Sequence, residues 1–142
     1  MNMFSTKSRY SLRVMIDLAE HCGGFTPMKE VAERQEISLK YVEKLLPVLT
    51  KSGLIKGVHG IGGGYRLTRE PDQYTVWEIL LTAEGELAPI ACLGSGSAPC
   101  ERAPECRTLP MWQKYYDLTK EYFSGITLAD LMRRDPADNY VI

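Results

Sequence analysis

Three consecutive glycines at 62–64, between basic flanks, constrain the fold of this chain more than any other feature. A P-loop would need G-x-x-x-x-G-K-[ST] and a dinucleotide-binding turn would need G-x-G-x-x-G, and neither pattern is present. Residues 65–68 alternate between apolar and polar, which is the period of a strand. A short, apolar-leaning run at 54–59 precedes the glycines. The stretch therefore predicts a β-hairpin with a glycine-rich turn, not a phosphate-binding loop.

The residues before the hairpin have the pattern of three helices. We expect the first over 5–22 and the second over 28–35, with Thr26 as its N-cap. The third follows Ser38 as N-cap and contains Pro47, where we expect a bend. The predicted core stripes are Leu12, Met15, Ile16 and Ala19 in the first helix and Val42, Leu45, Leu46 and Leu49 in the third.

This order of elements is typical of a winged helix-turn-helix domain, which we place at 1–75. The fold class is mainly α with a small β-hairpin, plus a long C-terminal helix. The charge is uneven: residues 1–75 hold 11 Lys and Arg against 8 Asp and Glu, a net +3, although the whole chain has a net charge of −1. Between 44 and 69 there are five basic residues and no acid. A basic stretch of this kind is often only a solvated face, but it also marks where an anionic partner would bind.

Together these features predict an interface for double-stranded DNA. A helix-turn-helix places its second helix in the major groove, and a wing contacts the backbone or the minor groove. Glycines at the hairpin tip allow close approach to a phosphodiester backbone, and Glu43 can accept from a cytosine amino group. The candidate DNA-binding residues are Lys7, Arg9, Ser38, Lys40, Tyr41, Glu43, Lys44, His59, Gly60 and Arg66.

Residues 76–142 form a second region with a different composition. A short amphipathic helix at 76–85 precedes a loop rich in proline and glycine at 89–110. A long helix over 111–123 follows, then a short one at 127–132 and a polar tail. Met111, Tyr115, Leu118 and Tyr122 are spaced 4-3-4, which is a heptad-like seam. The seam predicts a homodimer; packing on its own domain is the alternative.

Three of the four cysteines, Cys92, Cys100 and Cys106, lie together in this loop with the spacing C-x7-C-x5-C. Zinc sites usually contain a C-x2-C pair, which is missing here. The wide spacing favours an iron–sulfur cluster, with zinc, a redox thiol set, or no shared role for the three cysteines as alternatives. Three thiolates leave a fourth ligand open, with Glu101, Glu105, Ser8 and His21 as candidates. Cys22 is interpreted as a small buried apolar residue.

The chain resembles the IscR, NsrR and RirA family of bacterial winged-helix regulators, to which the cluster-free cysteine-metabolism repressor CymR is related. The resemblance covers nearly the whole chain. It implies a homodimer that binds promoter DNA, with repression or activation gated by a cluster held by the three loop cysteines. The motifs that carry it are "STKSRYSLR" at 5–13, "ISLKYVEKLLPVLTKSGLI" at 37–55, "GIGGGYRLTR" at 60–69, "ACL" at 91–93, and the three cysteines.

The chain departs from this family at three places. The IscR branch has a histidine three residues after the third cysteine, where this chain has Leu109. The acid that serves as fourth ligand in the NsrR branch has no clear match, so the cluster type, 2Fe–2S or 4Fe–4S, stays open. The family's wing often has arginine before the glycines, where this chain has His59.

Two other function classes fit the sequence less well. An enzyme or electron-transfer protein is not expected, because the only histidines, His21 and His59, lie in no acid–base constellation. A cluster-free, zinc-based or thiol-based repressor of sulfur metabolism that acts through a protein partner is the alternative. The chain has no apolar run of 18 residues and no signal-peptide core at its start, so we expect a cytoplasmic protein that does not span a membrane.

Overall fold

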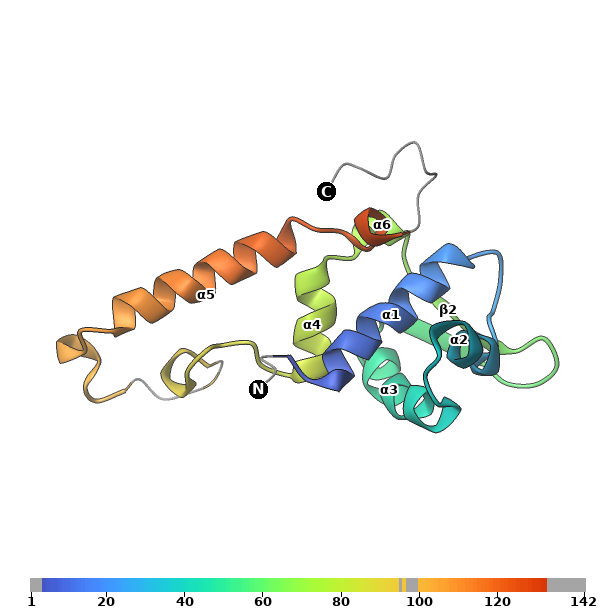
Figure 1. Cartoon of the computed structure of the whole chain (residues 1–142), viewed down its shortest axis with the longest axis horizontal. Helices are drawn as coiled ribbons and strands as arrows, with labels where there is room; N and C mark the ends of the chain where they lie inside the picture. The colour runs from blue at the N-terminus through green and yellow to red at the C-terminus, as the bar shows by residue number, and fades with distance from the viewer. Residues whose placement is uncertain (1–3, 95, 97–99, 133–142) are drawn as a thin grey trace.

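The computed structural model describes residues 4–94, 96 and 100–132 (Figure 1). It is mainly helical and contains one antiparallel hairpin, as the sequence predicts. The polar tail after residue 132 lies outside the described residues. The elements are α1 (Thr6–Glu20), α2 (Met28–Gln35), α3 (Leu39–Lys51), β1 (Ile55–Val58), β2 (Gly64–Leu67), η1 (Pro71–Gln73), α4 (Val76–Glu84), η2 (Ala91–Leu93), η3 (Ala103–Glu105), α5 (Leu109–Ser124) and α6 (Leu128–Leu131).

The helix starts follow the capping residues in two of three cases. The side chains of Ser5 and Ser38 accept from the third backbone N–H after them, as N-caps do. The prediction for Thr26 is wrong, because Pro27 holds the N-cap position of α2. The Thr26 backbone instead pairs with Tyr65, through N–O distances of 2.8 and 2.9 Å. This bridge adds a third short segment to the hairpin.

The hydrophobic core is centred on α1, which packs against α2, α3, α4 and α6 (Figure 1). The expected stripe of α3 is buried throughout. The stripe of α1 is shifted: Met15 and Ala19 are buried, but Leu12 and Ile16 are only partly buried at the edge of the core. A helix with neighbours on several sides buries a wider arc than a surface helix, so α1 also buries Ser8, Ser11, Val14, Asp17 and Leu18.

A buried ionic network joins α1 to α2. The Asp17 side chain is 1% exposed and lies on the buried side of α1. Arg34 donates to it from Nη2 at 2.7 Å and from Nε at 3.1 Å, and Gln35 donates from Nε2 at 2.9 Å. Arg13 donates to the Gln35 carbonyl oxygen. The hydrogen bond with Asp17 raises the pKa of Arg34. The network fixes the angle between the two helices that precede α3.

The hairpin is anchored at its base by Tyr74, which is fully buried. Its hydroxyl donates to the Leu54 carbonyl at 2.7 Å and accepts from the backbone N–H groups of Thr68 and Arg69. The Arg69 guanidinium lies 4.7 Å from the centre of the Tyr74 ring. One buried side chain therefore satisfies backbone groups at both ends of the hairpin and fixes its direction.

The second region extends away from this core. Helix α5 projects as an arm, with the loop after α4 running beside it (Figure 1). No residue of α5 is buried. The chain then returns to the core, where Leu128 is buried and Thr127 pairs with Thr75. No helix in the described part of the chain is both long and apolar enough to cross a membrane.

Candidate nucleic-acid interface and cysteine loop

The starts of α1 and α3 form one side of a basic recess. Lys7 from α1 and Tyr41, Lys44 and Leu45 from α3 line a space of about 260 Å³. Tyr41 packs edge-on against Tyr10 of α1, with ring centres 5.3 Å apart. The structure therefore brings together three of the predicted DNA-binding residues from helices that are distant in sequence. Two lysines beside a shallow recess suit a phosphate group.

The other predicted residues of α1 and α3 lie at the surface. Lys40 and Glu43 are exposed in the first turns of α3, the part of a recognition helix that contacts bases. Arg9 is exposed and donates to the Thr6 hydroxyl at 3.2 Å. Ser38 caps α3 by accepting from the Tyr41 N–H at 3.1 Å. Its hydroxyl proton remains able to donate to a phosphate.

The hairpin carries a second basic surface. Lys56 and Arg66 are directly opposite each other in the register of β1 and β2, and both are exposed. Directly opposite residues of an antiparallel pair point to the same face of the hairpin. They line a recess of about 380 Å³ together with Cys22. The prediction that Cys22 is buried is wrong: it is exposed, because α1 ends at Glu20 and the turn that follows leaves the core.

The turn of the hairpin is closed by glycines. Gly60 and Gly62 have φ angles of 97° and 77°, which favour glycine, and the Gly63 N–H donates to the Gly60 carbonyl at 3.0 Å. A Cβ on Gly63 would clash with the Val58 carbonyl oxygen. His59 is exposed at the start of this turn. The glycines thus give the hairpin a narrow tip, in which Ile61 carries a side chain between Gly60 and Gly62.

The three loop cysteines occupy separate positions along 85–108. Cys92 lies in η2, Cys100 is exposed, and Cys106 follows η3. In the described part of the chain, no three His, Cys, Asp or Glu side chains are grouped closely enough to hold a metal ion. Hydrogen bonding with Thr108, whose hydroxyl oxygen is 3.5 Å from Sγ, is the chief cause that lowers the pKa of the Cys106 thiol. The predicted convergence of the three thiols is therefore not a feature of this conformation.

Two of the four candidates for a fourth ligand lie outside the cysteine loop. Ser8 is 0% exposed and donates to a Glu84 carboxylate oxygen at 2.5 Å, so it faces the core. His21 caps the end of α1 that is remote from the cysteine loop (Figure 1). Glu101 and Glu105 are exposed within the loop itself. Of the four candidates, these two acids are the ones that lie in the same loop as the cysteines.

Sequence reasoning missed a connection between the cysteine loop and α1. Glu84 is the last residue of α4, directly before the loop. One of its carboxylate oxygens accepts from the Ser5 N–H at 2.9 Å, the Ser5 hydroxyl at 2.6 Å and the Ser8 hydroxyl at 2.5 Å. Lys7, which lines the basic recess, lies between these two serines. We call these three hydrogen bonds from Ser5 and Ser8 to Glu84 the Glu84 clamp. They connect the first residue before the cysteine loop to the start of α1. No local pattern in the sequence signals a contact between residues so far apart.

The Glu84 clamp should make stability depend on pH. Burial raises the pKa of the Glu84 carboxyl, but the hydrogen bonds from Ser5 and Ser8 outweigh it and lower the pKa overall. A lowered pKa means that the stabilisation is present above the unfolded value of about 4.3 and is lost as the pH falls through the folded value. We expect Glu84→Gln to reduce the free energy of unfolding by about 1 kcal/mol near pH 7. Urea unfolding at several pH values should show this difference shrinking below about pH 4.

Glu86 is a suitable matched control for this experiment. It lies two residues further on, and its carboxylate accepts from the neighbouring Leu87 and Ala88 N–H groups instead of from α1. Glu86→Gln should therefore leave the attachment of α1 unchanged. An equal loss of stability in both variants would contradict the role of the Glu84 clamp.

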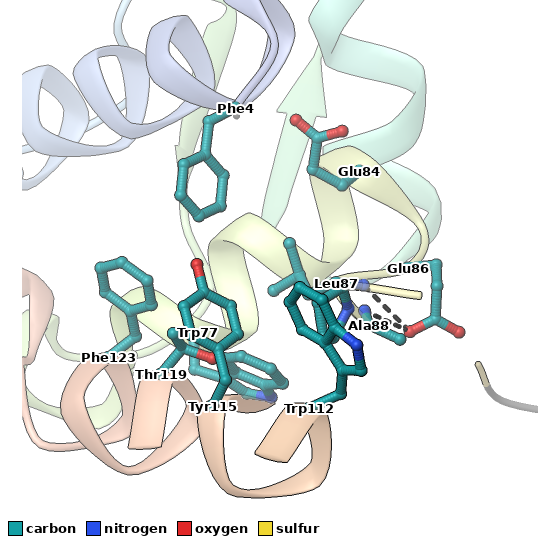
Figure 2. Close-up of a pocket in the computed structure, with 11 residues that line it drawn as sticks. Phe4, Trp77, Glu84, Glu86, Leu87, Ala88, Trp112, Tyr115, Thr119 and Phe123 are labelled. Carbon is teal, nitrogen blue, oxygen red and sulfur yellow. Dashed lines mark hydrogen bonds between the residues drawn. The ribbon is translucent and has the colours of Figure 1, made fainter. Parts of the chain in front are cut away.

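An aromatic groove lies between the start of the chain, α4 and α5 (Figure 2). It has a volume of about 490 Å³. Phe4 packs edge-on against Phe123 with ring centres 5.8 Å apart, and Trp77 of α4 lies 5.8 Å from Tyr116 of α5. These contacts hold the inner face of α5. Met111, Leu118 and Tyr122, three of the four residues of the predicted seam, are exposed on α5 and do not line the groove, whereas the fourth, Tyr115, is exposed but lines it.

Comparison with known proteins decides the family. The profile of the Rrf2 family, described as "Iron-dependent Transcriptional regulator", matches residues 4–134. The chain belongs to the Rrf2 family. The HTH-type transcriptional regulator IscR of Sodalis glossinidius is 35% identical over 132 residues, which cover 92% of this chain and 79% of that protein.

Two solved structures of Rrf2-type regulators show the same fold. CymR of B. subtilis, the global cysteine regulator, is 36% identical with a TM-score of 0.73, over 92% of this chain and 96% of that one. The IscR of T. potens is 34% identical with a TM-score of 0.67, over 94% of each chain. This Rrf2-family chain is thus a DNA-binding transcriptional regulator and not an enzyme, as the sequence predicted.

Proposed function

We propose that this Rrf2-family regulator acts as a homodimer that reads DNA with the start of α3 and the hairpin, and that an iron–sulfur cluster on Cys92, Cys100 and Cys106 gates its DNA affinity. One observation carries the proposal: the Glu84 clamp connects the root of the cysteine loop to the start of α1, beside the recess that Lys7 and Lys44 share. In this division, 1–75 binds DNA, and 76–142 holds the cluster and the dimer helix.

Two lysines and one glutamate on the exposed side of α3 support DNA binding by this helix. Lys40 and Lys44 are one helical turn apart and both exposed, so they present ammonium groups on the same side of α3. Glu43, between them, is repelled by phosphate but can accept a hydrogen bond from a cytosine amino group. The lysines therefore supply affinity, and Glu43 supplies discrimination between bases.

Replacing Lys44 with alanine tests the recess directly. We expect weaker binding to a selected duplex, with the slope of log K against log salt reduced by about 1, as for the loss of one phosphate contact. Lys51→Ala is the matched control, because Lys51 is an exposed lysine at the opposite end of the same helix. Glu43→Ala should instead relax the base preference. If Lys44→Ala binds like the unchanged protein in a salt titration, α3 does not contact phosphate there.

The donor chemistry of the loop fits an iron–sulfur cluster. Thiolates are the ligands that such clusters take, and three of them lie within 15 residues of a loop whose described residues contain two short 3-10 turns. Glu101 and Glu105 offer an oxygen for the remaining iron position. A bound cluster supplies a centre that responds to iron supply, redox state or nitric oxide. Drawing the three cysteines together would fix the path of the loop from Glu84 onward, and through the Glu84 clamp the position of α1.

Cysteine substitutions test which thiols bind iron. We expect Cys106→Ala to give folded protein that binds no iron and lacks the visible absorbance of a cluster after anaerobic purification. Cys22→Ala should keep full iron content, because Cys22 lies beside the hairpin and not in the loop. Zinc in place of iron in anaerobic metal analysis, or loss of iron in Cys22→Ala, would contradict the assignment.

The homodimer is supported by the exposed face of α5. Tyr122 is 65%, Met111 is 54% and Leu118 is 51% exposed, and they form an apolar strip along a helix of 16 residues. Tyr115, the fourth residue of the predicted seam, lines the aromatic groove. An identical strip on a second chain, packed with heptad spacing, would remove this surface from water. A two-fold dimer requires a roughly palindromic site with half-sites about one helical turn apart.

A second candidate function remains: a regulator of cysteine metabolism that senses without a cluster. It is favoured by the close match to CymR, and by the separate positions of the cysteines in the described chain. The two functions differ in one property. Colourless, iron-free protein from anaerobic cells, with promoter binding unchanged by Cys106→Ala, would favour the second.

A further inference from the structure

One exposed apolar side chain stands alone at the tip of the hairpin. Ile61 has an exposed fraction of 110%, so it touches nothing in the chain. Its neighbours in the turn are glycines, Gly60 on one side and Gly62 to Gly64 on the other. A large β-branched residue that gains nothing from the folded core is unusual at such a position, since glycine or a polar residue would suit the turn equally well.

The turn holds Ile61 in a fixed direction. Gly62 has φ 77°, the positive value that the third residue of a type II turn requires, and the Gly63 N–H closes the turn on the Gly60 carbonyl. Side chains at 63 and 64 would clash with the Val58 and Thr26 carbonyl oxygens. The tip is therefore a narrow ridge with a single apolar side chain, on a hairpin whose base Tyr74 anchors.

The charges of the hairpin indicate what this ridge meets. Lys56 and Arg66 face the same side on opposite strands, and His59 lies directly before the turn. In the described part of the hairpin, no acidic side chain lies between Lys56 and Arg66. An apolar tip between cationic flanks is complementary to the minor groove of DNA, which is about 6 Å wide, has phosphates along both walls and exposes base edges at its floor.

We propose that Ile61 is a minor-groove wedge that reads A·T base pairs and opens a base step beside each site contacted by α3. This inference rests on the proposed DNA-binding function and deepens it. A guanine places its N2 amino group in the floor of the minor groove, and an apolar side chain would bury that donor without a partner. An A·T pair has no such group. Apolar side chains of this type also part flexible steps such as TA and bend the duplex.

Selection from a random duplex pool tests the wedge. The full-length protein, the Ile61→Ala variant and the Val58→Ala variant would each select from duplexes with 40 random base pairs. Val58 is the matched control, because it is an exposed apolar residue on the body of the same hairpin. Ile61 makes no contacts in the fold, so its loss leaves folding intact.

We expect the unchanged protein and Val58→Ala to select A·T pairs at two symmetric positions, and Ile61→Ala to lose only that preference. On the selected duplex, Ile61→Ala should bind about tenfold more weakly, with an unchanged salt slope. A 2-aminopurine placed at the A·T step should brighten with the unchanged protein but not with Ile61→Ala.

Two outcomes would overturn the inference. If Ile61→Ala selects the same bases, with equal affinity and equal 2-aminopurine fluorescence, Ile61 does not read DNA; the α3 half-sites and the effect of Lys44→Ala would still support the proposed function. If the unchanged protein selects no sequence at all, both the wedge and the proposed interface fail.

Discussion

Replacing Arg34 with methionine is expected to lower the free energy of unfolding by about 3 kcal/mol, because it leaves the Asp17 carboxylate buried without its cation. Asp17 is 1% exposed, and its shortest contact is the 2.7 Å bond from Arg34. Gln35 would be the main remaining donor, at 2.9 Å. The methionine keeps most of the arginine's apolar stem, so the effect reports lost charge pairing more than lost packing.

Replacing the other partner of the pair, Asp17, should lower the free energy of unfolding by less. In Asp17→Asn, the Arg34 side chain, which is already 32% exposed, can turn its charge into water. Lys29→Met is the matched control on the same helix, because Lys29 is exposed and has no described ion pair. Urea unfolding at pH 7 measures all three. A loss below about 1 kcal/mol for Arg34→Met would show that the network does not hold α1 against α2.

Replacing Leu118 with lysine is expected to convert the dimer to a monomer and to weaken binding to a palindromic duplex at least about 100-fold. Leu118 lies near the centre of the exposed strip on α5, and a lysine there would place two like charges against each other across a two-fold axis. A monomer engages one half-site and loses the gain from binding both at once.

Light scattering at micromolar concentration measures the assembly, and fluorescence anisotropy measures the affinity. Gln113→Lys adds the same charge to an exposed position of α5 that lies off the strip, and should stay dimeric. A dimeric Leu118→Lys variant would place the interface elsewhere.

Local patterns account for most of the fold. The Ser38 cap and the stripe from Val42 to Leu49 specify α3, and the alternation after the glycines specifies β2; the structure confirms all of these. These signals work because capping and periodicity depend on residues within one or two turns of each other. The predicted cap at Thr26 is wrong because a long-range contact, and not a local pattern, decides the role of this residue. Its backbone is taken by Tyr65, a partner 39 positions away that no local rule can find.

The connections that position the candidate site depend on tertiary packing. Glu84 meets Ser5 and Ser8 because α4 packs against α1, and Tyr74 reaches three backbone groups because the hairpin folds over it. A partial signal exists for Asp17, since a charged residue on the apolar side of a helix requires a partner. Cysteine is usually buried, which is why the sequence predicts a buried Cys22. Its exposure depends instead on where α1 ends, and residue type does not predict that.

Cluster gating is tested by comparing the affinities of two forms of the protein for one DNA duplex. Protein purified without oxygen and loaded with iron and sulfide, and the same protein after iron removal, would be titrated against a selected palindromic duplex by fluorescence anisotropy. We expect the dissociation constants to differ by about 5- to 150-fold, and Cys106→Ala to match the iron-free form under both conditions. Equal dissociation constants for the two forms would contradict a gating role for the cysteine loop.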